Sequence, residues 1–75
     1  MNEFNDRGER HGYWEYMRKK VNYYNGEIHG HYENYWDDKF KRIFCKGKYN
    51  MIQRIGQWVW YDSDGKSLYR KEFYL

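Results

Sequence analysis

The chain has 75 residues, 33% of them charged, and it carries a formal net charge of +3. So short a chain forms one domain, here residues 1–75, and it needs large side chains to build a core. Its single cysteine excludes an internal disulfide framework, and no run of apolar residues reaches the length that a membrane span requires.

Composition predicts an all-β protein. The chain has ten Tyr, four Trp and four Phe, but no Pro and no Ala. Aromatic residues favour strands and an Ala-free chain disfavours helices, so we expect no helix. The N-terminus lacks the apolar segment of a signal peptide, which favours a cytoplasmic protein. Many Asn, Lys and Tyr without Ala or Pro are also typical of AT-rich phage or low-GC bacterial genes, and a phage protein would act in the host cytoplasm.

Six strands are expected, joined as an antiparallel meander. Two turns are strongly marked, because Asn25-Gly26 and Asp64-Gly65 are residue pairs that tight hairpin turns favour. The expected strands lie at about 10–17, 20–24, 28–36, 39–48, 55–62 and 66–74. The expected turns lie at Arg18-Lys19, Asn25-Gly26, Asp37-Asp38, Asn50 to Arg54 and Asp62 to Gly65.

A unit of glycine and aromatic residues occurs three times, in residues 6–16, 25–35 and 51–61. In each unit a glycine is followed two residues later by a large aromatic residue. The pairs are Gly12 with Trp14, Gly30 with Tyr32, and Gly56 with Trp58. The first two units have another glycine four residues earlier, where the third has Ile52. The repeat glycines are expected to open strands, at a bulge or where two backbones approach closely.

Alternation along the expected strands predicts which side chains form the core. One face collects the aromatic residues Trp14, Tyr16, Tyr32, Trp36, Trp58 and Trp60, which are either core or interface. The other face collects Tyr13, Glu15, Met17, His31, Glu33, Tyr35, Gln57, Val59 and Tyr61. With no helix to cover it, the aromatic face must curl onto itself, pair with a second copy or bind a partner.

The three units resemble MORN repeats. The matching patterns are G-Y-W-x-Y, Y-Y-N-G-E-x-x-G-x-Y-x-x-Y and G-x-W-x-x-Y-D-x-D-G-K, and they extend over residues 6–74. They are most similar to the variant found in bacterial antitoxin-like and phage proteins. The repeat glycines are 18 and then 26 residues apart, so a longer hairpin around 39–49 interrupts the array. The resemblance implies an elongated single-layered sheet of successive hairpins. It also implies scaffolding, protein binding, self-association or phospholipid binding, and no catalytic residues.

The titratable residues lack the patterns of catalytic and metal sites. His11, His29, His31 and Cys45 do not have the spacing of zinc ligands, and we expect His11 and His29 to fill polar positions before the repeat glycines. Cys45 is expected to be a small buried apolar group rather than a nucleophile. The segment 62–65 begins like a calcium loop but lacks the closing glutamate, and turn chemistry explains it. We therefore expect no metal, no cofactor and no enzymatic activity.

Charge is segregated along the chain. Residues 1–38 carry five basic and eight acidic side chains, whereas residues 39–75 carry nine basic and three acidic ones. The segment 39–49 interleaves cations with aromatic residues, a pattern that can hold phosphates and stack bases. It can equally pair as a strand with the acidic strand before it. The residues expected to share one face of this strand are Phe40, Arg42, Phe44, Lys46 and Lys48.

We interpret the chain as a non-enzymatic protein-binding module that acts through its aromatic face, as a small phage or bacterial inhibitor or antitoxin-like factor. Self-association into a homo-oligomer is part of this interpretation. The alternatives are nucleic-acid or nucleotide binding through residues 39–49, and binding to anionic phospholipid, which the lack of a basic amphipathic helix disfavours. The residues expected to contact the partner are Lys39, Lys41, Arg42, Phe44, Lys46, Lys48, Trp36 and Arg54.

Overall fold

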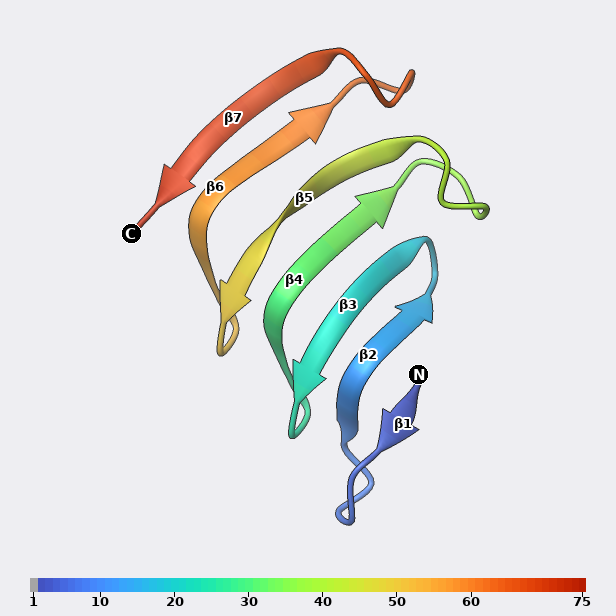
Figure 1. Cartoon of the computed structure of the whole chain (residues 1–75), viewed down its shortest axis with the longest axis vertical. Helices are drawn as coiled ribbons and strands as arrows, with labels where there is room; N and C mark the ends of the chain where they lie inside the picture. The colour runs from blue at the N-terminus through green and yellow to red at the C-terminus, as the bar shows by residue number, and fades with distance from the viewer. Residues whose placement is uncertain (1) are drawn as a thin grey trace.

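The computed structural model describes residues 2–75 and confirms an all-β protein. Seven strands form one antiparallel sheet in chain order, each hydrogen-bonded to the next (Figure 1). The strands are β1 (Glu3–Phe4), β2 (Arg10–Tyr16), β3 (Lys19–Tyr24), β4 (Glu27–Tyr35), β5 (Ile43–Asn50), β6 (Gln53–Tyr61) and β7 (Leu68–Tyr74). This order is the expected meander, in which every connection joins neighbouring strands.

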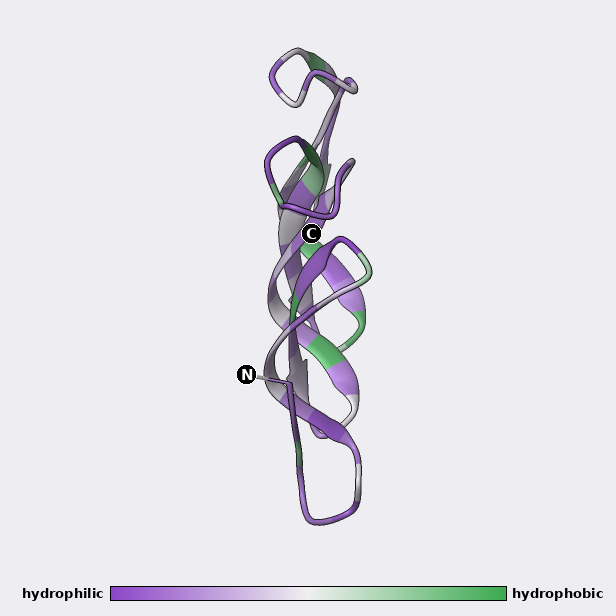
Figure 2. Ribbon diagram, turned by 90° about the vertical axis from the view of Figure 1, so that its right-hand side faces the viewer, coloured by the Kyte–Doolittle hydropathy of each residue, from purple (hydrophilic) through white to green (hydrophobic). Residues whose placement is uncertain are grey.

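The sheet is a single curved layer. Its extents are 41 × 31 × 11 Å, and the view along the sheet shows a thin, bent ribbon with no second layer against it (Figure 2). Residues 2–75 contain no helix, and hence none long and apolar enough to cross a membrane. All packing must therefore come from side chains that lie over their own sheet.

The strand boundaries correct the sequence prediction in two places. The short strand β1 was not expected, and it makes the total seven rather than six. The strand expected at 39–48 begins only at Ile43, because residues 36–42 form a closed loop. In this loop the Asp37 carboxylate accepts hydrogen bonds from the backbone N–H groups of Lys41 and Arg42, and Phe40 has a φ of 57°. A strand cannot run through such a backbone.

Two-residue turns close three of the hairpins. Their central residues are Met17-Arg18, Asn25-Gly26 and Met51-Ile52, and all six have positive φ. The turn at 25–26 confirms the prediction, whereas the others are shifted or shorter than the predicted Arg18-Lys19 and Asn50 to Arg54. Positive φ at both centres matches the right-handed twist of the strands and explains why these hairpins are so tight.

The repeat glycines lie inside strands rather than at their starts, and they form the expected bulges. Gly30 in β4 and Gly56 in β6 have φ values of 95° and 67°. At each of them the register shifts against the neighbouring strand, β3 and β5 respectively, so that three residues oppose one. Gly12 in β2 also has a positive φ, of 79°. A bulge increases the local twist and bends the strand, so the repeat glycines are where the sheet curves.

One face of the sheet carries the core, and we call it the aromatic face. Trp14, Trp58 and Trp60 are buried as predicted, and Tyr16 and Tyr32 are half-buried. The predicted sixth member, Trp36, is 37% exposed because β4 ends one residue before it. Cys45 is buried, as expected, and the structure adds two buried residues on this face that the pattern did not single out, Val21 and Tyr23.

The core consists of two aromatic clusters joined by one tyrosine. The first is built on Trp14, and the second on Trp58 and Trp60. Tyr32 packs against both clusters. Its ring centroid lies 5.6 Å from that of Trp58. The two halves of the sheet therefore share one continuous apolar layer.

Arginine side chains cover the solvent side of this layer. The Arg10 guanidinium carbon lies 5.0 Å from the ring centroid of Trp14, and that of Arg54 lies 4.8 Å from the ring centroid of Trp58. Both arginines stand two residues before a repeat glycine. Cation–π contact with an aromatic face contributes about 0.5–1 kcal/mol at exposed sites. The arginines thus take the place that a second layer has in a sandwich.

Hydrogen bonds to histidines couple each of the first two units to the next hairpin turn. The backbone N–H of Asn25 donates to His11 Nδ1 over 3.2 Å, and that of Met51 donates to His29 Nδ1 over 3.1 Å. Both histidines stand directly before a repeat glycine, in the polar positions expected of them. The second turn residue donates its N–H to the carbonyl two residues before the same glycine, over 2.8 Å in both repeats. The first two units therefore share a set of contacts as well as a pattern of residues.

A close contact joins Trp58 to Gly47 across β5 and β6. A Cβ atom at Gly47 would lie 2.2 Å from the indole ring of Trp58. Trp58 is 1% exposed, and its Nε1–H donates to the Lys48 carbonyl over 3.1 Å. Only a glycine leaves room for the ring to lie flat against the neighbouring strand.

We predict that Gly47→Ala destabilises the fold strongly. Overpacking a rigid core costs about 1–3 kcal/mol, and we expect the upper part of that range because the ring has no free side to move to. Urea denaturation followed by tryptophan fluorescence measures the change. The matched control is Lys46→Ala on the other face, with an expected change within about 0.5 kcal/mol. Equal effects of the two changes would contradict the packing assigned to Trp58.

We predict that Ile52→Gly stabilises the protein. Ile52 is β-branched and has a φ of 79°, a conformation that costs such residues about 1–3 kcal/mol. Glycine removes this strain and loses some chain entropy, so the free energy of unfolding should rise by about 1 kcal/mol. Thermal melts measure the gain. Gln53→Gly, in the adjoining strand, should lower stability, and a loss of stability for both variants would contradict the strain at Ile52.

Candidate functional site

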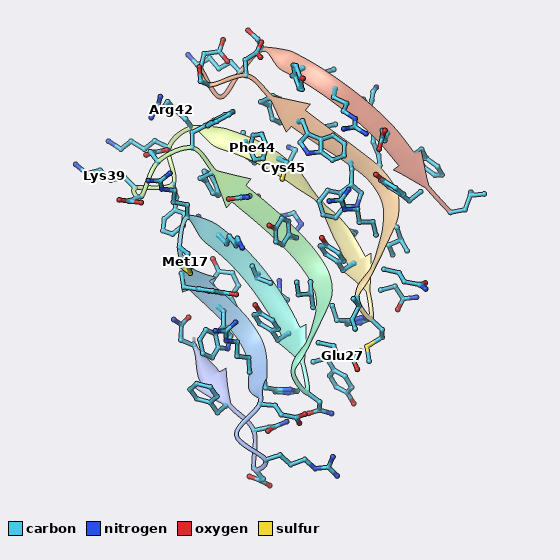
Figure 3. All side chains as sticks on the ribbon, turned by 180° about the vertical axis from the view of Figure 1, so that it is seen from behind. Met17, Glu27, Lys39, Arg42, Phe44 and Cys45 are labelled. Atoms are coloured by element: carbon cyan, nitrogen blue, oxygen red, sulfur yellow. The ribbon has the colours of Figure 1, made fainter. Side chains whose placement is uncertain are left out.

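The residues expected to contact a partner do not form one surface. They divide among the loop at 36–42, the aromatic face and the opposite face of the sheet. Lys39 and Arg42 lie at one end of the sheet, close to Met17, whereas Glu27 lies at the other end (Figure 3). The basic segment is therefore not the continuous strand face that the sequence suggested.

The loop at 36–42 is held by the neighbouring loop between β6 and β7. Trp36 Nε1–H donates to the Asp62 carbonyl over 2.9 Å, and Arg42 donates to the Ser63 carbonyl over 3.2 Å. The backbone N–H groups of Arg42 and Lys41 hold the pKa of Asp37 below its ordinary value. This part of the predicted site is well explained as a structural loop, although the side chains of Lys39 and Lys41 remain exposed.

Phe44 and Arg54 serve the aromatic face. Phe44 packs against the cluster of Trp58 and Trp60, and its ring centroid lies 4.7 Å from that of Trp36. Arg54 lies over Trp58 and donates a hydrogen bond to the Tyr74 hydroxyl over 3.2 Å. Both residues thus stabilise the core, and the prediction that Phe44 shares a face with Lys46 and Lys48 is wrong. A bulge in β5 breaks the alternation between Ile43 and Cys45.

The opposite face carries a row of alternating charges across its strands. Glu15 lies opposite Lys20, Lys20 opposite Glu33, and Glu33 opposite Lys46. Burial raises the pKa of Glu33, but hydrogen bonds from His31 and Tyr35 outweigh it and leave that pKa below its ordinary value. Glu33 is therefore ionised at neutral pH. Part of the basic segment therefore pairs with the acidic strand before it, which was the alternative explanation of that segment.

Beyond this row, the opposite face has a hollow over β4, β5 and β6. Its volume is about 450 Å³, and its lining includes His31, Lys46, Lys48, Ile55, Gln57 and Val59. The floor is aliphatic, because the side chains of Ile55 and Val59 in β6 point to this face of the sheet. The lysines lie on its rim, with Lys46 Nζ 6.0 Å from the ring centroid of Tyr61.

Apolar side chains continue from the hollow onto β7. Leu68 is 55% exposed and Phe73 is 70% exposed, and both lie on this face opposite residues of β6. Lys71 is the charged residue between them. On the part of this face that belongs to β6 and β7, the structure places no acidic residue. We call the whole area the basic-rimmed surface, and it comprises His31, Lys46, Lys48, Ile55, Val59, Tyr61, Leu68, Lys71 and Phe73.

Sequence reasoning found Lys46 and Lys48 but missed the apolar half of this surface. Val59 and Tyr61 were assigned correctly to the non-aromatic face, yet no role was given to them. Leu68 and Phe73 follow the same alternation, one strand later. The sequence contained a signal for this surface, because these positions are apolar although they lie on the face that should be polar in a single-layered sheet.

The groups weighed as reactive or as metal ligands have structural partners. Cys45 is buried, and burial raises the pKa of its thiol to about 11. His31 Nε2 lies 3.0 Å from the Glu33 carboxylate. The Ser67 hydroxyl and the backbone N–H groups of Lys66 and Ser67 lower the pKa of Asp64 to about 2, as suits a turn. Among residues 2–75, no three His, Cys, Asp or Glu side chains gather as a metal site would require.

Comparisons of the chain with protein-family models, with curated proteins and with solved structures found no match. The geometry of the sheet therefore carries the functional argument by itself.

We predict that Cys45 does not react with a thiol reagent in the native state. With a pKa of about 11, the thiol is almost entirely protonated at pH 8, and only the thiolate attacks. Ellman's reagent should label the folded protein slowly and the urea-unfolded protein at once. The labelling rate of the folded form should rise with pH towards 11. Rapid, complete labelling of the folded protein at pH 7 would contradict this environment.

Proposed function

We propose that the chain is a non-enzymatic protein-binding module that docks an acidic partner on the basic-rimmed surface. The observation that carries the proposal is a hollow with an aliphatic floor and two lysines on its rim. Apolar contacts in such a hollow supply affinity, and the lysines orient a partner of opposite charge and speed its approach.

The aromatic face is the weaker candidate for this role. Trp14, Trp58 and Trp60 are already buried in the isolated chain, and arginines lie over their rings. A partner would have to displace these cations before it could reach the indoles. The opposite face instead leaves more than half of Leu68 and of Phe73 exposed. This contrast moves the proposed interface from the face expected initially to the other one.

The three glycine-and-aromatic units support a relation to MORN repeats, as part of the same proposal. A small protein that offers one basic-rimmed surface is suited to block a partner's own binding site. We therefore propose an inhibitor or antitoxin-like role in the cytoplasm, in the host if the gene belongs to a phage.

An acidic protein fits this surface better than a nucleic acid does. The floor of the hollow is formed by Ile55 and Val59, and bases stack on aromatic rings rather than on aliphatic side chains. The aromatic members of the surface, Tyr61 and Phe73, do not line the hollow. Phe40 and Phe44, which were expected to stack bases, pack against Tyr35 and Trp36 respectively. Phosphate contacts by Lys46 and Lys48 alone would give weak binding with no preference for a base.

Selection from a random peptide library against the folded chain tests this proposal. We expect enriched peptides that combine Asp or Glu with a large apolar residue. NMR titration should shift the signals of Ile55, Val59 and Lys48. Lys48→Glu should weaken binding by about tenfold or more, because it replaces attraction by repulsion at the rim.

The matched control is Lys41→Glu, which makes the same charge change on the exposed loop and should leave binding within about twofold. Peptides enriched in basic residues, or shifts confined to the aromatic face, would refute the proposed surface. A single-stranded oligonucleotide and anionic vesicles are titrated in parallel. Tighter binding of either through Lys46 and Lys48 would replace the protein partner by a nucleic acid or a membrane.

A further inference from the structure

The two edges of the sheet differ in how open they are. At the first edge, β1 has only two residues, and Asn2 extends the hydrogen bonding with β2 beyond them. The Asn2 side chain accepts a hydrogen bond from the Glu15 N–H over 2.8 Å and donates one to the Glu15 carbonyl over 3.1 Å. Its backbone N–H donates to the Tyr13 carbonyl over 2.8 Å. A short strand and a capping side chain are devices that blunt an edge against further pairing.

The second edge is open along its whole length. The strand β7 has seven residues and is the last strand of the sheet, so within residues 2–75 nothing pairs with its outer side. It carries the exposed apolar side chains of Leu68, Tyr69 and Phe73. A long edge strand with apolar side chains is a template for another strand.

The repeat shows that this edge has the geometry to accept a strand. Gly12 pairs with Tyr23, Gly30 with Tyr49, and Gly56 with Tyr74. β7 therefore occupies the place in the third repeat that β3 and β5 occupy in the first two. On the corresponding edge, β3 accepts β4 and β5 accepts β6.

We propose that β7 pairs with β7 of a second copy, antiparallel and centred on Lys71, so that two sheets join into one. A closed dimer follows because the chain has one open edge and one blunted edge. Two copies can satisfy the open edges of each other, whereas a head-to-tail filament would need both edges to be open.

The charges of β7 are complementary about this centre. Pairing around Lys71 places Arg70 of each copy opposite Glu72 of the other, on the aromatic face. In one chain these two residues already bond to each other, and both side chains are substantially exposed. The register pairs residues 69–73 of the two copies and sets Tyr69 opposite Phe73 on both sides of the centre, whereas the bulge at the start of β7 leaves Leu68 outside the pairing. Cross-strand pairs of opposite charge and of two aromatic residues each contribute about 0.2–1 kcal/mol.

The cost of this register is one contact between like charges. The two copies of Lys71 lie opposite each other on the exposed face, where their long side chains can diverge into water. Two Arg–Glu pairs and two aromatic pairs oppose this single repulsion. Registers centred on Arg70 or Glu72 also place like charges at the centre, and they lose the Arg–Glu pairs.

The proposed dimer does not depend on the proposed function, but it bears on it. A twofold axis perpendicular to the sheet keeps the same face of both copies on the same side. The two basic-rimmed surfaces would then meet along one continuous sheet. A bivalent or twofold-symmetric acidic partner would gain affinity from binding both.

A pair of charge variants tests the register. Arg70→Glu places Glu opposite Glu at two positions of its own dimer, and Glu72→Arg places Arg opposite Arg. We expect sedimentation equilibrium to show a dimer for the unaltered chain. The dissociation constant of each variant should rise by about tenfold or more, because two attractive pairs become repulsive. An equimolar mixture of the two variants should regain the dimer, since every mixed pair is again of opposite charge.

Two controls separate loss of pairing from loss of folding. Thermal melts of each variant show whether the chain stays folded, and recovery in the mixture is possible only for folded chains. Lys66→Glu and Glu27→Arg make matched charge changes outside β7 and should leave the dimer intact. A monomeric unaltered chain at high concentration would overturn the proposal. So would variants that dimerise normally, or a mixture that stays monomeric although both variants are folded.

Discussion

The fold depends on how Trp58 packs against Gly47. A sheet in one layer has no opposing layer to bury its apolar side chains, so they must be buried by their neighbours in the same sheet. The indole of Trp58 lies flat on the backbone of β5 because Gly47 has no side chain, and Arg54 covers the other side of the ring. Trp14 has the same cover from Arg10, and Tyr32 joins the two clusters. Glycine below, aromatic ring between and arginine above make up a core only one side chain deep.

This arrangement explains why the two faces have different roles. The aromatic face uses its apolar surface to hold the fold together, and its cations are engaged by the rings below them. The opposite face contributes charge pairs near its centre and leaves aliphatic side chains and lysines free towards β7. The division follows from alternation along β6, where Trp58 and Trp60 point to one side and Val59 to the other. Stability and the proposed recognition can therefore change independently, since they use different sides of the same strands.

Much of this was readable in the sequence, for physical reasons that particular residues show. Asn25-Gly26 marks its turn because both positions need positive φ, and Trp58 marks the core because its size leaves few places for it. Residues 39–42 were wrongly predicted as strand, because the alternation of polar and apolar residues does not reveal the hydrogen bonds that the Asp37 carboxylate accepts from Lys41 and Arg42. Gly47 was missed as a structural position for a related reason, whereas Ile52 was recognised in the place of the turn glycine but not as a strained residue. The first matters through a ring on another strand, and the second adopts a conformation that its residue type disfavours.

The histidine hydrogen bonds have a consequence for how such a sheet can change in length. His11 lies in the first unit and His29 in the second, and each accepts a hydrogen bond from the turn that begins the next unit, so both units carry their own means of attachment. All of these contacts lie at the end of the sheet that holds the turns at 25–26 and 51–52. The spacing between repeat glycines differs at the other end, where a two-residue turn in one unit corresponds to the loop 36–42 in the next. Duplication of a unit would thus preserve the attachment, while insertions accumulate at the other end, whose loops are held by contacts outside this repeated set.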